Sequence, residues 1–127
     1  MASNKILIAE DDATFLKLLA FKLKGAGYET MGIERGDEVI AAFEKYNPDL
    51  VILDGLLPVT NGFELAKQIR TIPSGKSIPI VLLTGVYKEP EFFKHAKEIG
   101  INLHYDKSTF KDAEFIGEIK KLLSSRG

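Results

Sequence analysis

The sequence predicts an α/β fold, a doubly wound five-stranded parallel sheet with helices on both faces. Five short apolar runs alternate with longer segments whose apolar residues recur at helical spacing. Glycine, proline and polar residues separate these segments. Strands that alternate regularly with helices form βαβ units with right-handed crossovers, and such units place their strands parallel in one sheet.

The expected strands are short runs rich in Ile, Leu and Val. The clearest is Leu50–Leu53, which has no alternation of polar and apolar residues, as expected where helices cover both faces of a strand. The weakest is the last one. In chain order, the expected strands are Ile6–Ala9, Tyr28–Ile33, Leu50–Leu53, Ile80–Thr84 and Leu103–Tyr105.

A helix is expected after each strand. In the first, the apolar residues Phe15, Leu19 and Leu23 recur at helical spacing, and glycines follow at its end. Pro90 suits the first turn of the fourth helix, where a missing N–H does no harm. The expected helices span about 13–25, 36–46, 62–72, 90–98 and 110–124.

Length and composition indicate one domain, residues 1–127, which is either complete or a fragment of a longer protein. Lys and Arg number 17 against 18 Asp and Glu, a balance that predicts no direct binding to nucleic acid or membranes. We find no signal peptide and no run of the roughly 18–20 apolar residues that a membrane span needs. The chain has no Cys, so a cytoplasmic location is expected.

Polar residues follow the expected strands at the points where they end. Glu10 and Asp11 follow the first strand, Asp54 the third, Thr84 ends the fourth and Lys107 comes after the fifth. In open α/β sheets this carboxyl edge binds ligands, at the point where strand order reverses. For strand order 2-1-3-4-5 that point lies between strands 1 and 3, so the strands that carry the acids are neighbours.

Three converging carboxylates repel one another unless a cation joins them. An all-oxygen site suits Mg²⁺, which often bridges protein carboxylates to phosphate. Asp54 is then placed to attack phosphorus and form an acyl phosphate. A lysine ammonium and a threonine hydroxyl would bind the phosphoryl oxygens.

With these residues in place, three segments carry a resemblance to a known family. They are ILIAEDD at residues 6–12, DLVILD at 49–54 with LP at 57–58 and NGFEL at 61–65, and PIVLLTG at 79–85. The chain resembles the receiver domain of two-component response regulators, the family that includes the chemotaxis regulator. The resemblance extends from about Lys5 to Leu123.

The resemblance implies a flavodoxin-like fold with strand order 2-1-3-4-5. It implies that Mg²⁺ is bound by Glu10, Asp11, Asp54 and the main-chain carbonyl of Leu56. A sensor histidine kinase or a phosphotransfer domain would phosphorylate Asp54. The family acts as a signalling switch rather than an enzyme, and it takes part in its own phosphoryl transfer and dephosphorylation.

The resemblance also implies an output. Thr84 and Lys107 would bind the phosphoryl group, and the aromatic switch position of the family corresponds to His104. Phosphorylation would then change a surface that binds an output partner or effector domain, which the sequence does not identify.

The sequence departs from the family pattern near the end of the chain. Ser108 follows Lys107 where the family has a proline joined by a cis peptide, so we expect a trans peptide here. Phe110 follows one residue later than usual, which leaves the placement of Lys107 open. His104 replaces a Tyr or Phe and can titrate near neutral pH. Asn61 replaces a common Asp.

Other interpretations stay open for the same residues. Part of the acidic run can cap the first helix, a role we assign to Asp12. An aspartyl phosphohydrolase would carry a second Asp where this chain has Leu56. A receiver-like module that binds partners without phosphorylation is a further alternative, while a flavin carrier is disfavoured by the acidic, glycine-poor loop after the first strand.

Overall fold

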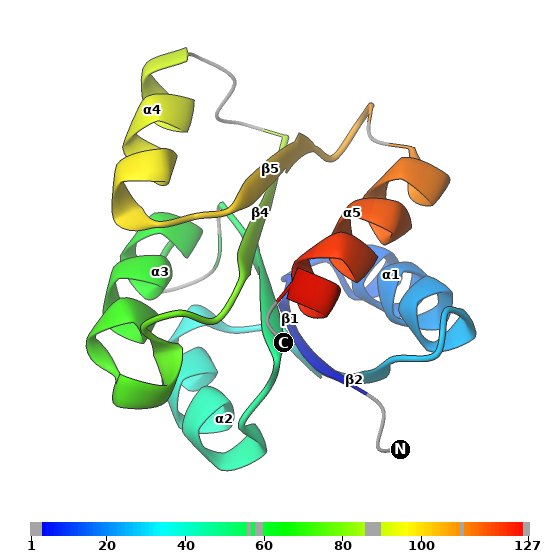
Figure 1. Cartoon of the computed structure of the whole chain (residues 1–127), viewed down its shortest axis with the longest axis horizontal. Coiled ribbons are helices and arrows are strands. Elements are labelled where there is room, and N and C mark those ends of the chain that lie inside the picture. Colours follow the sequence, from blue (N-terminus) through cyan, green and yellow to red (C-terminus); the bar gives the residue numbers. More distant parts are fainter. Residues whose placement is uncertain (1–3, 56, 58–59, 86–89, 110, 126–127) are drawn as a thin grey trace.

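A computed structural model describes residues 4–55, 57, 60–85, 90–109 and 111–125, with only the backbone described at 90–93 and 125. Its sheet has five parallel strands in the order β2-β1-β3-β4-β5, which confirms the predicted class and topology. The strands are β1 (Lys5–Ala9), β2 (Glu29–Ile33), β3 (Leu50–Asp54), β4 (Ile80–Thr84) and β5 (Leu103–Asp106). Figure 1 shows the sheet between two layers of helices.

The helices lie where they were predicted, with small shifts at their ends. They are α1 (Ala13–Gly25), α2 (Val39–Tyr46), α3 (Gly62–Thr71), α4 (Pro90–Ile99) and α5 (Asp112–Ser125). A 3₁₀ turn, Gly36–Glu38, directly precedes α2, so the start of the second predicted helix is this turn. Another 3₁₀ turn, Pro73–Gly75, follows α3. The last helix begins at Asp112 rather than Phe110, which lies outside the described residues.

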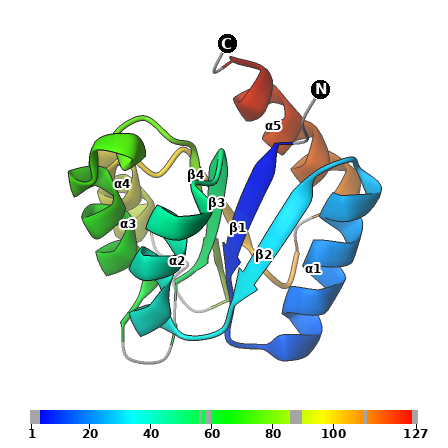
Figure 2. The same cartoon turned by 90° about the horizontal axis from the view of Figure 1, so that it is seen from below.

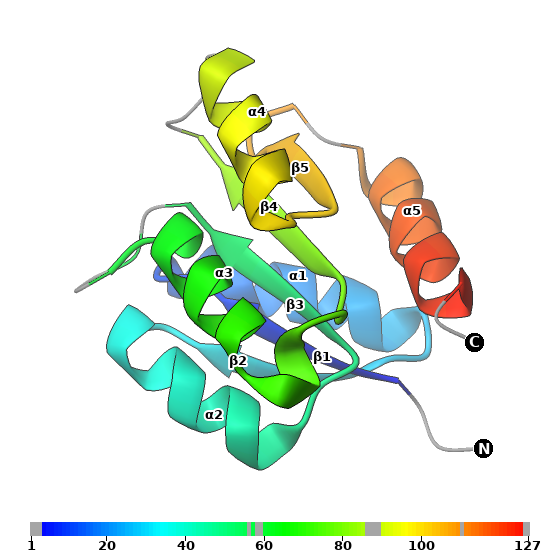
Figure 3. The same ribbon diagram turned by 60° about the vertical axis from the view of Figure 1, so that its left-hand side comes forward.

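Helices cover both faces of the sheet. Figure 2 shows α1 and α5 on one side and α2, α3 and α4 on the other, and Figure 3 shows the second group packed side by side. Successive side chains of a strand point to opposite faces, so Leu7 and Val51 join the core under α2–α4 while Ile8 and Ile52 join the core under α1 and α5. Burying one such side chain stabilises the fold by about 1.5–3 kcal/mol.

Side-chain caps determine where two helices start beside the carboxyl edge of the sheet. Asp12 accepts hydrogen bonds from the main-chain N–H groups of Thr14 and Phe15, which confirms its predicted role as the cap of α1. Asn61 accepts a bond from the N–H of Glu64 at the start of α3. None of the described helices is long and apolar enough to cross a membrane.

Candidate phosphorylation and metal site

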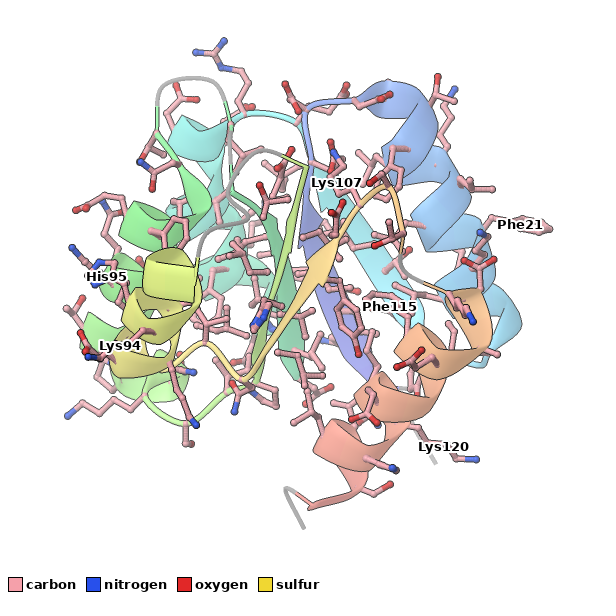
Figure 4. The ribbon with its side chains drawn as sticks, turned by 90° about the horizontal axis from the view of Figure 1, so that it is seen from above. Phe21, Lys94, His95, Lys107, Phe115 and Lys120 are labelled. Carbon is pink, nitrogen blue, oxygen red and sulfur yellow. The ribbon has the colours of Figure 1, made fainter. Side chains whose placement is uncertain are left out.

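The parallel register brings the polar strand ends to one edge of the sheet. Asp54 ends β3 opposite Leu83, one residue before Thr84 at the end of β4. Glu10 directly follows β1, the other neighbour of β3. Figure 4 shows Lys107, which follows β5, near the end of the sheet from which α1 begins.

Three carboxylates meet at this edge. Glu10 and Asp54 are almost fully buried, with 1% and 5% of their surfaces exposed, and Asp11 is exposed. One oxygen from each lies within 4.8 Å of the others, a spacing at which a single cation can contact all three. The sequence prediction that these acids converge is therefore met by the geometry, while the ion that they bind stays a prediction.

Lys107 also reaches this cluster. Its ammonium nitrogen lies 2.8 Å from Oε1 of Glu10 and 3.4 Å from Oδ2 of Asp54. The Lys107–Ser108 peptide is trans, as predicted. The ammonium of Lys107 therefore lies beside the acids, while its role in binding a phosphoryl group stays a prediction.

A short turn holds the main chain on both sides of Lys107. The N–H of Lys107 donates to the carbonyl of Thr84 at 3.2 Å. Oδ1 of Asp106 accepts bonds from the N–H and the hydroxyl of Ser108, at 2.9 and 2.7 Å. These bonds turn the chain back toward the sheet edge directly after β5.

Burial and charge shift the pKa values of the two central groups in the metal-free protein. Burial raises the pKa of Glu10 to about 7, and the charge of Asp54 adds to this effect although the hydrogen bond from Lys107 opposes it. Partial burial disfavours the charged form of Lys107, but its bond to Glu10 and the charge of Asp54 outweigh burial and raise the pKa of the ammonium. The ammonium therefore stays charged. For Glu10, the bond from Lys107 does not offset the cost of burying a charged carboxylate.

The donor set fits a small hard cation. The second oxygen of Glu10, Oε2, is buried and has no hydrogen-bond partner among the described residues, a costly state for a carboxylate oxygen. The three carboxylates supply only oxygen donors, the type that Mg²⁺ prefers. Leu56, whose carbonyl was predicted as a further ligand, lies outside the described residues.

The two remaining predicted residues lie on β4 and β5. Thr84 is buried at the end of β4. His104 pairs with Leu82 in the sheet register, and burial lowers the pKa of its imidazole. The structure places it in the wall of a surface hollow of about 460 Å³, which is lined by Lys97, Gly100, Ile101, Asn102 and His104.

Sequence reasoning missed one contact of the site. Phe15 was expected only as an apolar position of the first helix, yet its ring centre lies 4.7 Å from the ammonium nitrogen of Lys107. Its place in the first turn of α1, directly after the acids and their cap, is the signal that would have pointed to it.

Comparison with known families gives the site its context. The family model of the response regulator receiver domain matches residues 6–120. The chain belongs to this family. Receiver domains are the phosphoacceptor modules of two-component systems, so the predicted family, fold and general function are confirmed.

Relatives and solved structures agree with this assignment. The phosphate regulon transcriptional regulatory protein PhoB of Pseudomonas aeruginosa is 32% identical over 127 residues, which are 100% of this chain and 55% of that protein. The chemotaxis protein CheY4 of Vibrio cholerae has a TM-score of 0.87 and 28% identity over 95% of this chain and 99% of that one. A signal receiver domain of a signal transduction histidine kinase from Syntrophus aciditrophicus has a TM-score of 0.87 and 31% identity, with 97% and 92% covered.

These matches differ in what accompanies the receiver domain. The chain spans about half the length of the curated relatives that it matches, such as PhoB, with 55% covered. It spans nearly all of the CheY4 chain, with 99% covered. What this receiver domain is joined to or acts upon is therefore a separate question from its family.

Proposed function

We propose that this receiver domain accepts a phosphoryl group on Asp54 in a Mg²⁺-dependent reaction, and that the donor is a phosphohistidine of a sensor histidine kinase or a phosphotransfer domain. One observation carries the proposal. The buried Asp54 carboxylate lies beside two further acids, and the Lys107 ammonium is 3.4 Å from its Oδ2. Such a kinase draws its phosphoryl group from ATP, which supports a cytoplasmic location.

The charges of the site require a divalent cation before an anionic phosphoryl group can enter. When all three carboxylates are ionised, they and the ammonium leave two negative charges at the edge of the sheet. Glu10, Asp11, Asp54 and the carbonyl of Leu56 would hold Mg²⁺ there. The ion would supply charge neutralisation for the transferring phosphoryl oxygens, which is the main demand of phosphoryl transfer.

The residues of this chain then carry out a displacement at phosphorus. A carboxylate oxygen of Asp54 forms the new P–O bond while the P–N bond of the donor breaks, and the imidazole leaves with the electron pair and takes up a proton. A carboxylate nucleophile has no proton to lose, so this attack needs no general base. Lys107 moves its ammonium from the carboxylates to a phosphoryl oxygen, as a point charge and hydrogen-bond donor.

The same site would act on a partner-binding surface. We infer that Thr84 donates its hydroxyl to the phosphoryl group and that His104 then reorients, changing the surface of α4, β5 and α5. The protein is a signalling switch that takes part in its own phosphorylation and dephosphorylation, rather than an enzyme that turns over other substrates.

Intact-mass analysis after incubation with acetyl phosphate tests the proposal. One added phosphoryl group is expected, and it should require both Mg²⁺ and Asp54. An Asp54→Asn variant should gain none, whereas Asp112→Asn, a matched change on the exposed start of α5, should gain one. No addition to a protein that still binds Mg²⁺ would instead indicate an interaction module that works without phosphorylation.

A further inference from the structure

The ammonium of Lys107 has an aromatic neighbour as well as its two carboxylate partners. The centre of the Phe15 ring lies 4.7 Å from the ammonium nitrogen, within the distance at which a cation is attracted to the ring face. Lys107 comes from the turn after β5 and Phe15 from α1, so the contact joins two distant parts of the chain. About a fifth of the Lys107 side chain is exposed, at 21%, and this partial exclusion of water strengthens the attraction.

The ring stands on a rigid support. Asp12 caps α1 and accepts a hydrogen bond from the N–H of Phe15 at 3.2 Å, which fixes this residue in the first turn of the helix. The half-buried side chain also packs against the core between α1, α5 and the sheet. Because Glu10 and Asp11 directly precede this cap, the position of the ring is tied to that of the acids.

The three partners of the ammonium respond differently to the proposed reaction. Glu10 and Asp54 would bind the metal ion, and Asp54 would become an acyl phosphate. The attraction of each carboxylate for the Lys107 ammonium would therefore weaken. The Phe15 ring has no formal charge and no proton to exchange. The attraction between the ring and the ammonium therefore persists during the reaction. Because the ring is uncharged, the ammonium keeps its full positive charge for the phosphoryl oxygens.

We propose that Phe15 is a positioning residue for Lys107, which holds the ammonium at the site while its carboxylate partners change. The proposal rests on the phosphorylation of Asp54 proposed above. The ring does not touch the reacting atoms; it limits where the flexible lysine side chain places its charge. Without the ring, the ammonium is expected to spend less time beside the phosphoryl group.

The test compares Phe15→Leu, which keeps an apolar side chain without a ring, with Phe15→Tyr, which keeps the ring. Phe21→Leu is the matched control, since Phe21 lies on the same helix and is 77% exposed (Figure 4). Each protein is phosphorylated with acetyl phosphate and Mg²⁺. The Leu variant at position 15 should react about fivefold more slowly, and the Tyr variant and the control at nearly the wild-type rate.

A second measurement follows the ammonium directly and does not depend on phosphorylation. The ε-methylene protons of Lys107, assigned by comparison with Lys107→Arg, should show an upfield ring-current shift in the NMR spectrum. The shift should persist in Phe15→Tyr and disappear in Phe15→Leu. Urea denaturation of both variants identifies any loss of stability, which a packing role alone would produce.

Two results would overturn the proposal. The first is a wild-type shift and rate in Phe15→Leu. The second is equal slowing in the Leu and Tyr variants, because the Tyr ring keeps the face that attracts the cation and should therefore restore the rate. If even the wild-type protein gains no phosphoryl group, the proposed function fails, and the NMR comparison alone decides whether Phe15 positions Lys107.

Discussion

Gly62, the first residue of α3, lies directly against the main-chain carbonyl of Asp54. A β-carbon at Gly62 would stand 2.4 Å from that oxygen and 3.0 Å from Cδ1 of Leu82. The N–H of Gly62 also donates to the carbonyl of Gly55 at 3.3 Å. The close approach of helix and strand therefore depends on the absence of a side chain, and it ties α3 to the end of the strand that carries Asp54.

A Gly62→Ala variant is expected to lose about 1–3 kcal/mol of unfolding free energy, because the backbone around Asp54 must move to admit the methyl group. Phosphorylation by acetyl phosphate should slow as well. Urea denaturation and intact-mass kinetics measure the two effects. Gly117→Ala is the control: a β-carbon there meets no atom within 4 Å, so this helical position should gain stability. Equal stability of the two variants would refute the steric argument.

The acidic part of the site was predictable because a parallel α/β sheet brings the carboxyl ends of its strands to one edge. The position of Glu10 and Asp54 follows from strand order alone. Lys107 depends instead on a turn that is held by the side chains of Asp106 and Ser108, and a single sequence does not reveal such bonds. The Phe15 contact was missed because helical spacing predicts which face of a helix is apolar, but not which cation reaches it.

Glu10 destabilises the metal-free fold, since its carboxylate is buried with one oxygen unpartnered. Its folded pKa of about 7 exceeds the ordinary 4.5, so the folded state binds more protons than the unfolded state between these values, and stability falls as pH rises through this window. Glu10→Gln should therefore be more stable than wild type at pH 8 without Mg²⁺, by about 1–3 kcal/mol.

Urea denaturation monitored by circular dichroism checks this prediction. The advantage of Glu10→Gln should shrink toward pH 4.5, and Mg²⁺ should stabilise the wild type much more than the variant. Glu114→Gln, at an exposed position in the first turn of α5, is the control and should show no such advantage. A variant that is less stable than wild type at pH 8 would contradict the assigned cause.

Lys107 would compete with a bound Mg²⁺ for the carboxylates of Glu10 and Asp54. Its ammonium lies 2.8 Å from Glu10 and repels a divalent cation nearby. Lys107→Met should thus bind Mg²⁺ about two- to tenfold more tightly, since a tenfold change in affinity needs only about 1.4 kcal/mol. The same variant should accept a phosphoryl group more slowly, because it lacks the ammonium that binds the phosphoryl oxygens. Isothermal titration calorimetry measures the affinity, with Lys120→Met on the exposed side of α5 as the control (Figure 4). Weaker Mg²⁺ binding would show that the lysine supports the metal site.

Arg70 connects the end of α3 to the loops before β4 and β5. Its guanidinium donates to the carbonyls of Gly75, Ile78 and Gly100, and to the side-chain oxygen of Asn102. Arg70→Lys keeps the charge but cannot span these acceptors, so we expect a loss of about 2–4 kcal/mol of stability. Phosphorylation of the folded fraction should be unchanged. A loss below 0.5 kcal/mol in urea denaturation would mean that water replaces the guanidinium.

Asp106 and Ser108 provide the last test, because together they hold the turn that delivers Lys107. Asp106→Ala removes the acceptor of two hydrogen bonds, whereas Ser108→Ala removes only the hydroxyl donor. Each lost hydrogen bond should lower the free energy of unfolding by about 0.5–1.5 kcal/mol, so Asp106→Ala should be the less stable variant. Asp106→Ala should also be phosphorylated more slowly than Ser108→Ala. Mg²⁺ affinity should not fall in either variant, since the carboxylates stay in place. Equal phosphorylation rates in both variants and wild type would show that contacts of the Lys107 side chain, including the Phe15 ring, hold the ammonium without help from the turn.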